Sequence, residues 1–222
     1  MAATRHLGLG VIETRWFDDG HHTVRPLFEF LSYALKDRSD AFTYERFVGA
    51  DSFRDAVRFI MSGPDVDFLY VAAHGDFAKI EAPDGSGMSR TFLRNTFVDA
   101  NRGRRRRLKG VLFGSCKFGE ADNLIEIMRP AKIRGEEIGN RLLWVAGYGE
   151  EIDYTRSSLL DIYFYDIFFR TGGRDEITRV RKTLERLDKA LPGLMEGLAL
   201  RVVGRQPRGR YRDLVSGEFI AD

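Results

Sequence analysis

Three short, uninterrupted apolar runs constrain the fold of this chain more than any other feature. They span residues 67–73, 109–114 and 142–147. A strand with one solvated face alternates apolar and polar residues, whereas a strand of a parallel sheet is covered on both faces and is apolar throughout. The runs have the length of strands and end in glycine or small residues. We therefore predict three buried strands of a parallel sheet.

Amphipathic segments between these runs predict helices that cover the sheet. Residues 175–191 are the clearest case, because Ile177, Val180, Leu184 and Leu187 recur at steps of three and four and share one helix face. Strands that alternate with helices predict an α/β fold with right-handed crossovers, in which ligands bind beyond the carboxyl ends of the strands. Further helices are expected at 24–36, 51–61, 91–101, 121–128 and 155–170, and further strands at 7–14, 42–48 and 198–203.

The composition sets limits on partners and on cysteine chemistry. The chain has 222 residues, 43% of them hydrophobic, which suits one domain with a sizeable core. Its 35 basic and 33 acidic residues give a formal net charge of +2, so no electrostatic partner follows for the whole molecule. The single cysteine, Cys116, rules out an internal disulfide and a CxxC zinc site. A lone cysteine is usually a buried apolar side chain, so its chemistry has to come from its context.

The sequence also bears on the compartment. The first residues lack the basic-then-apolar pattern of a signal peptide. The longest clean apolar run, 68–73, is too short to cross a bilayer. We expect a soluble, cytoplasmic protein without a membrane partner, in a reducing compartment where a thiol stays usable.

Two of the predicted strands are followed by reactive side chains. His74 follows the run at 67–73, and Cys116 follows the run at 109–114 after one serine. Parallel strands end at the same edge of a sheet and lie about 5 Å apart, so these side chains can meet across a scissile peptide. A thiol is a strong nucleophile, and a neighbouring imidazole can take its proton and return it to a leaving amine. The pattern predicts a catalytic pair, whereas either residue alone is more simply a buried structural side chain.

Acyl transfer also needs donors for the developing oxyanion. The backbone N–H groups of Gly75 and Cys116 are the candidates, since both lie at the predicted strand ends. Glycine at position 75 fits this role because a substrate carbonyl must approach the backbone closely there.

These residues resemble the caspase-like (clan CD) cysteine peptidases, which include caspases, metacaspases, separase, gingipains and bacterial CHAT domains. The resemblance lies in an apolar strand ending in His74-Gly75 and a second strand ending in a small residue and Cys116. The segment 144–153, followed by an aromatic helix at 159–169, looks most like a CHAT-type domain.

The resemblance carries several expectations. It implies a three-layer α/β/α sandwich with a mostly parallel sheet, filling residues 1–222 as one domain with a helical C-terminal part from about 172. It implies a His74–Cys116 dyad with Gly75 in the oxyanion hole, a protein substrate, no cofactor, and an activating or regulatory protein partner in a signalling or bacterial defence pathway. The sequence departs from caspases after the cysteine, where residues 117–119 replace the Arg or Gln and Gly of caspases. Cleavage after aspartate is therefore not implied.

Acidic residues near the strand ends raise the question of specificity. Asp76, Glu150 and Asp153 follow predicted strands and can form an acidic pocket for a Lys or Arg side chain. The alternative is that they are turn and helix-initiating acids, which favour first helical turns. Arg15, just after the first strand, points the other way, toward an acidic substrate residue. Cleavage after a basic residue is our hypothesis, and both alternatives stay open.

Other polar clusters have simpler interpretations. The basic run at 102–109 can contact phosphates, but it lacks interleaved aromatic residues and is more typical of a solvated loop. A weaker basic cluster at 205–212 has the same ambiguity, and a nucleic-acid partner is not expected. His21 and His22 lack helical ligand spacing, so no metal site is expected. Two alternatives to an active peptidase remain: a catalytically silent binding module that keeps the fold, and a nucleic-acid-binding α/β domain.

Overall fold

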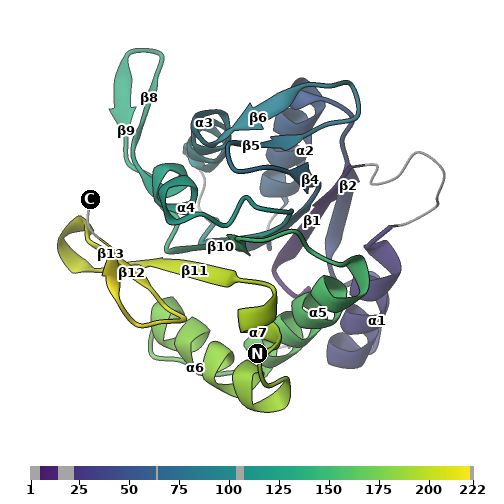
Figure 1. The fold of residues 1–222 in the computed structure, drawn as a ribbon. Helices are drawn as coiled ribbons and strands as arrows, with labels where there is room; N and C mark the ends of the chain where they lie inside the picture. Colours follow the sequence, from purple (N-terminus) through teal and green to yellow (C-terminus); the bar gives the residue numbers. More distant parts are fainter. Residues whose placement is uncertain (1–5, 15–22, 64, 104–107, 221–222) are drawn as a thin grey trace.

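The computed structural model describes residues 6–14, 23–63, 65–103 and 108–220. In these ranges eight strands form one central sheet in the order β13-β12-β11-β10-β7-β3-β1-β2 (Figure 1). The five strands from β10 to β2 run parallel, and β11, β12 and β13 extend the β10 edge in antiparallel pairing. The strands are β1 (Leu9–Glu13), β2 (Thr43–Arg46), β3 (Phe68–Ala72), β7 (Gly110–Gly114), β10 (Trp144–Tyr148), β11 (Leu200–Arg205), β12 (Tyr211–Asp213) and β13 (Phe219–Ile220).

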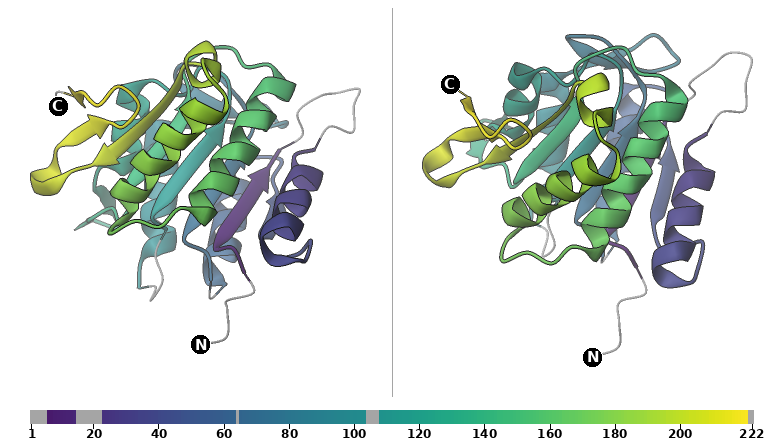
Figure 2. Two further views of the ribbon diagram at one scale, coloured as in Figure 1. Left: turned by 90° about the horizontal axis from the view of Figure 1, so that it is seen from below. Right: turned by 60° about the horizontal axis from the view of Figure 1, so that its bottom comes forward.

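Helices cover both faces of this sheet (Figures 1 and 2). One face packs against α2 (Ala50–Ser62), α3 (Arg90–Asn101) and α4 (Ala121–Met128) in a single apolar cluster. The opposite face packs against α1 (Arg25–Lys36), α5 (Tyr154–Arg170), α6 (Glu176–Ala190) and α7 (Leu194–Gly197). The predicted three-layer α/β/α sandwich with a mostly parallel sheet is confirmed.

The three apolar runs are the three central strands. β3, β7 and β10 are buried at every position, which is why their sequences carry no polar alternation. The aromatic side chains of α5 fill the second cluster, where Phe164 and Phe168 stack with ring centroids 5.8 Å apart and Trp144 meets Phe164 edge to face. This packing holds α5 against the central strands β3, β7 and β10.

Some elements differ from the expectation. A small antiparallel sheet of β4 (His74–Gly75), β5 (Lys79–Glu81) and β6 (Gly87–Ser89) follows β3 and was not predicted. A hairpin of β8 (Ala131–Ile133) and β9 (Glu136–Ile138) projects from the body of the molecule (Figure 1). The part from about 172 is helical only at its start, in α6 and α7, and then enters the sheet as β11, β12 and β13.

Some expectations fall on residues that the structure does not describe. Arg15, His21 and His22 lie outside the described residues, as does the middle of the basic run at 104–107. None of the described helices has both the length and the apolar character needed to cross a membrane.

Candidate active site

The sheet register brings His74 and Cys116 together. β3 and β7 are neighbours, with Ala72 opposite Gly114 at their carboxyl ends. The N–H of Ala73 donates to the C=O of Gly114 at 3.5 Å, so the pairing continues past the last strand residue. His74 and Cys116 follow two residues after Ala72 and Gly114, so both lie just beyond the carboxyl ends of neighbouring strands. His74 is exposed and Cys116 is partly buried, so a substrate can reach both.

Gly75 lies directly against the backbone of residues 115–116. A Cβ at position 75 would stand 2.9 Å from the C=O oxygen of Cys116 and 3.0 Å from the Cβ of Ser115. Any side chain there would push the two strand ends apart. Glycine is therefore required by the close approach of the chain that carries His74 to the chain that carries Cys116.

The loop after Cys116 is tied to the end of β10. The N–H of Ile152 donates to the Cys116 Sγ at 3.5 Å, and the N–H of Lys117 donates to the C=O of Glu150 at 2.9 Å. Lys117 has a φ of 58°, so the chain turns sharply away immediately after the cysteine. An N–H directed at sulfur orients the thiol and stabilises negative charge that develops on it. Cys116 is thus held between the ends of β3 and β10.

Two of the three predicted specificity acids also have local structural roles. The Oδ1 of Asp76 accepts from the N–H groups of Ala78 at 2.7 Å and Lys79 at 2.9 Å, and so closes the turn between β4 and β5. Asp153 is the N-cap of α5, and its Oδ1 accepts from the N–H of Arg156 at 2.9 Å. Their roles as turn and helix-initiating residues therefore explain the contacts of one carboxylate oxygen in each acid, Oδ1.

Glu150 has a different environment. Its C=O accepts from the N–H of Lys117, so the backbone of Glu150 lies beside the residue that follows Cys116. Its side chain is exposed, and within the described part of the chain its carboxylate makes no hydrogen bond or ion pair. The neighbouring Glu151 pairs instead with Lys117 at 3.7 Å. Of the predicted acids, Glu150 is the one whose carboxylate has no local structural role within the described residues.

A buried carboxylate anchors the end of β1. Glu13 is fully buried and accepts hydrogen bonds from the N–H of Val24 at 2.8 Å, the hydroxyl of Thr23 at 2.6 Å and the hydroxyl of Tyr44 at 2.5 Å. Burial, followed by the bond to Glu13, raises the pKa of Tyr44 to about 12, so this phenol remains a donor. Glu13 joins the start of α1 to the edge of the sheet near the strand ends.

A second buried carboxylate lies behind β7. Asp161 of α5 accepts from the hydroxyl of Tyr70 in β3 and the hydroxyl of Tyr148 in β10, both at 2.6 Å. Burial raises the pKa of Asp161 to about 7. The hydroxyl of Tyr70 occupies the space that a side chain at Gly114 would need. The cluster thus clamps the two strands that flank β7, two residues before Cys116.

Neither buried acid was predicted from the sequence. The available signal is an acid inside an otherwise apolar segment, as for Glu13 at the end of β1 and Asp161 in α5. Such a residue is costly to bury without partners, so it indicates a polar contact. The partners come from distant parts of the chain and leave no local pattern.

The described basic residues of the run at 102–109 are engaged in ion pairs. Arg102 pairs with Glu136 at 2.8 Å, and Lys109 pairs with Asp67 at 3.2 Å. Within the described residues, no three His, Cys, Asp or Glu side chains gather closely enough to hold a metal ion.

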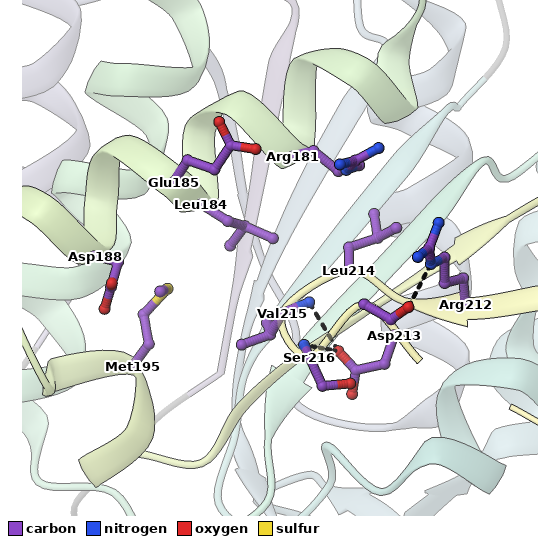
Figure 3. A pocket seen from close by; sticks show the side chains of 11 residues that line it. Arg181, Leu184, Glu185, Asp188, Met195, Arg212, Asp213, Leu214, Val215 and Ser216 are labelled. Carbon is purple, nitrogen blue, oxygen red and sulfur yellow. Dashed lines mark hydrogen bonds between the residues drawn. The ribbon is translucent and has the colours of Figure 1, made fainter. Parts of the chain in front are cut away.

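A cavity of about 370 Å³ lies away from these strand ends, between α6 and the segment 212–217. Figure 3 shows Arg181 and Glu185 of α6 on one side of it and Arg212 and Asp213 on the other. Asp213 accepts from the N–H groups of the residues two and three positions further on, so its carboxylate supports the local turn. The described lining residues include no cysteine or histidine, and the reactive side chains are those at the strand ends.

Comparison with known proteins supports the fold. No protein-family profile matches this sequence, and no curated protein matches it. Among solved structures, the Arg-specific cysteine proteinase gingipain R matches with a TM-score of 0.54 at 10% identity, over 88% of this chain and 45% of that chain. Caspase-1 from Spodoptera frugiperda matches with a TM-score of 0.45 at 15% identity, over 82% of this chain and 77% of that chain.

The gingipain R match supports the α/β/α fold of this chain. The gingipain match has the higher TM-score, and this chain spans less than half the length of that proteinase. At these identities the likeness concerns the fold. Activity has to be argued from the residues at the strand ends.

Proposed function

We propose that this chain is a cysteine endopeptidase in which Cys116 is the nucleophile and His74 is the general acid and base. One observation supports the proposal most: His74 and Cys116 each follow by two residues the carboxyl end of one of two neighbouring parallel strands, β3 and β7. The close approach of Gly75 to the Cys116 carbonyl supports it, because it brings the two backbones into contact at this point.

The reaction proceeds in two halves. His74 takes the thiol proton, and the Cys116 sulfur attacks the scissile carbonyl to form a tetrahedral oxyanion. The C–N bond then breaks, the amine leaves with the proton from His74, and a thioester remains on Cys116. A water molecule, deprotonated by His74, attacks the thioester, and the acid product leaves as the thiol regains its proton.

The oxyanion is stabilised by backbone donors. We assign the N–H groups of Gly75 and Cys116 to this role, since they flank the point where the two strand ends meet. The N–H of Ile152 acts on the sulfur, to which it already donates at 3.5 Å. These donors need no reorganisation during the reaction, which is the condition for effective electrostatic stabilisation.

Specificity for a basic residue rests on Glu150. Its exposed carboxylate has no partner within the described residues, and its backbone bonds Lys117, the residue after Cys116. A Lys or Arg side chain of a substrate would form a charge-assisted hydrogen bond with it. Gingipain R is Arg-specific, and that specificity is a property of that proteinase. In this chain we assign the preference for a basic substrate residue to Glu150, with Asp76 and Asp153 as secondary contributors.

The biological setting follows from the resemblance. A caspase-like peptidase acts on protein substrates and can require an upstream protein that activates it. We propose a cytoplasmic role in signalling or bacterial defence, with the CHAT-type likeness of residues 144–153 as its sequence basis. Hydrolysis by a thiol and an imidazole uses no cofactor.

Reporter peptides test this proposal. Peptides that release a fluorophore after Arg, Lys or Asp are incubated with the wild type and with Cys116→Ala, His74→Ala and Glu150→Gln. We expect cleavage after Arg or Lys, loss of activity in the first two variants, and a fall of about tenfold or more in kcat/KM in Glu150→Gln. Glu151→Gln is the matched control, because it removes the adjacent charge and leaves the Glu150 carboxylate in place. Preferential cleavage after Asp would overturn the role of Glu150.

A further inference from the structure

A buried amide joins the loop that follows His74 to the loop that follows Cys116. Asn123, in the first turn of α4, is 1% exposed. Its Nδ2 donates to the C=O of Phe77 at 2.8 Å and to the C=O of Phe118 at 3.3 Å. Phe77 lies three residues after His74, and Phe118 lies two residues after Cys116. One side chain thus spans the two loops that carry the proposed dyad.

The chemistry of the contact requires an amide. Two carbonyl oxygens need two N–H donors, and the nitrogen of a primary amide supplies both from one atom. The Oδ1 of Asn123 faces the other way and accepts from the Nη1 of Arg90 at 3.4 Å, which sets the amide orientation. An aspartate would place an acceptor against two acceptors, and an apolar side chain would leave both carbonyls without this donor.

A second contact joins the same loops. The Nζ of Lys117, next to Cys116, lies 5.9 Å from the centre of the Phe77 ring. This cation–π contact is at the surface, whereas the Asn123 amide is enclosed, so the amide is the stronger constraint on the loop separation.

We propose that Asn123 is a positioning residue of the peptidase, which sets the distance between His74 and Cys116 by bonding both loops at once. The inference rests on the proposed function of that pair. A displacement of about 1 Å between reacting groups can lower a rate by about a hundredfold, so a residue that touches neither group can still control the reaction. The sequence gives no sign of this role, because Asn123 lies in an ordinary amphipathic helix.

The protein contains its own matched control. Asn140 is 4% exposed and bonds the other end of the same helix: its Nδ2 donates to the C=O of Ile127 at 2.6 Å and of Arg129 at 3.2 Å, and its Oδ1 accepts from the N–H of Leu142 at 3.1 Å. Asn123→Ala and Asn140→Ala therefore remove similar numbers of buried hydrogen bonds from one helix. Only the first acts on the loops that carry the dyad.

The rate of alkylation of Cys116 by iodoacetamide is the readout. Because Cys116 is the only cysteine, intact mass reports this thiol alone, and no substrate is needed. The rate is measured as a function of pH for the wild type, His74→Ala, Asn123→Ala, Asn140→Ala and the His74→Ala/Asn123→Ala double variant, with folding checked by circular dichroism. Asn123→Ser, which keeps a smaller donor, replaces Asn123→Ala if the latter does not fold.

We expect Asn123→Ala to lose at least about tenfold of the rate and to follow the pH profile of His74→Ala. Asn140→Ala should stay within about twofold of the wild type, and Asn123→Ala should add nothing in the His74→Ala background. Equal rates for Asn123→Ala and Asn140→Ala would overturn the positioning role while leaving the dyad intact. Equal rates for the wild type and His74→Ala would instead refute the proposed function, and the inference with it.

Discussion

At position 75 the molecule has no room for a side chain. The atoms that a Cβ would meet are the Cys116 carbonyl oxygen and the Cβ of Ser115, which belong to a neighbouring buried strand end and cannot rotate away. Glycine is therefore required at position 75 by the short distance between two backbone segments. The same short distance brings the residues after β3 and β7 close enough to form one site.

Replacing Gly75 by alanine should lower the reactivity of Cys116 while the protein still folds. The new methyl group forces the His74 and Cys116 strand ends apart, so we expect the alkylation rate of Cys116 to fall about tenfold and stability to fall by about 1–3 kcal/mol. Gly139→Ala is the control, because no atom lies within 4 Å of its added Cβ. An unchanged alkylation rate in Gly75→Ala would show that the two strand ends are not coupled in this way.

At the scale of elements, the sequence allowed the central strands and most helices to be predicted, because each has its own apolar pattern. The predicted span of α4 at 121–128 agrees with the structure, and those of α1 and α3 differ by one residue at their starts. The short strands β4 to β6, β8, β9, β12 and β13 were not predicted. Each has two or three residues beside turns rich in Gly, Asp and Pro, so its pairing depends on tertiary contacts.

The candidate site also contains residues that could be predicted from the sequence and residues that could not. His74, Gly75 and Cys116 were predictable because they come directly after buried strands, and parallel strands all end at one edge of their sheet. Asn123 and Asp161 were not, since each is recognised only by partners from distant segments of the chain.

The packing of α4 on β10 gives a prediction at this scale. A Cβ on Gly119, just before α4, would lie 2.5 Å from the backbone carbon and oxygen of Gly147 in β10. Gly119→Ala should therefore lower the free energy of unfolding by about 1–3 kcal/mol, measured by urea denaturation. Gly172→Ala, whose Cβ meets nothing within 4 Å, should be neutral or stabilise by up to about 1 kcal/mol. Equal effects of the two substitutions would contradict this contact.

For the whole molecule, the buried cluster behind the sheet links stability to pH. Asp161 is 2% exposed and is surrounded by Tyr70 of β3, Tyr148 of β10 and Tyr165 of its own helix. Burial raises the pKa of each of these tyrosines well above 10, so they stay protonated and do not titrate in the neutral range. The pH dependence of the cluster is therefore that of the Asp161 carboxyl.

The sign of this dependence follows from linkage. The pKa of Asp161 is raised from 3.8 to about 7 in the folded chain, so between these pH values the unfolded chain releases a proton that the folded chain keeps. The free energy of unfolding should fall as pH rises through this window, by about 4 kcal/mol in total. Asp161→Asn has no proton to lose and should remove that decline. Urea midpoints measured across the window test it, and parallel profiles for the two proteins would refute it.

The central claim is that His74 activates Cys116 for attack on a carbonyl, and one measurement tests it most directly. The folded protein is treated with an acyloxymethyl ketone that carries an Arg residue, and the intact mass is recorded for the wild type, Cys116→Ala and His74→Ala. We expect one adduct per chain in the wild type, none in Cys116→Ala and little in His74→Ala. Equal labelling of the wild type and His74→Ala would contradict it, because the thiol would then react without help from the imidazole.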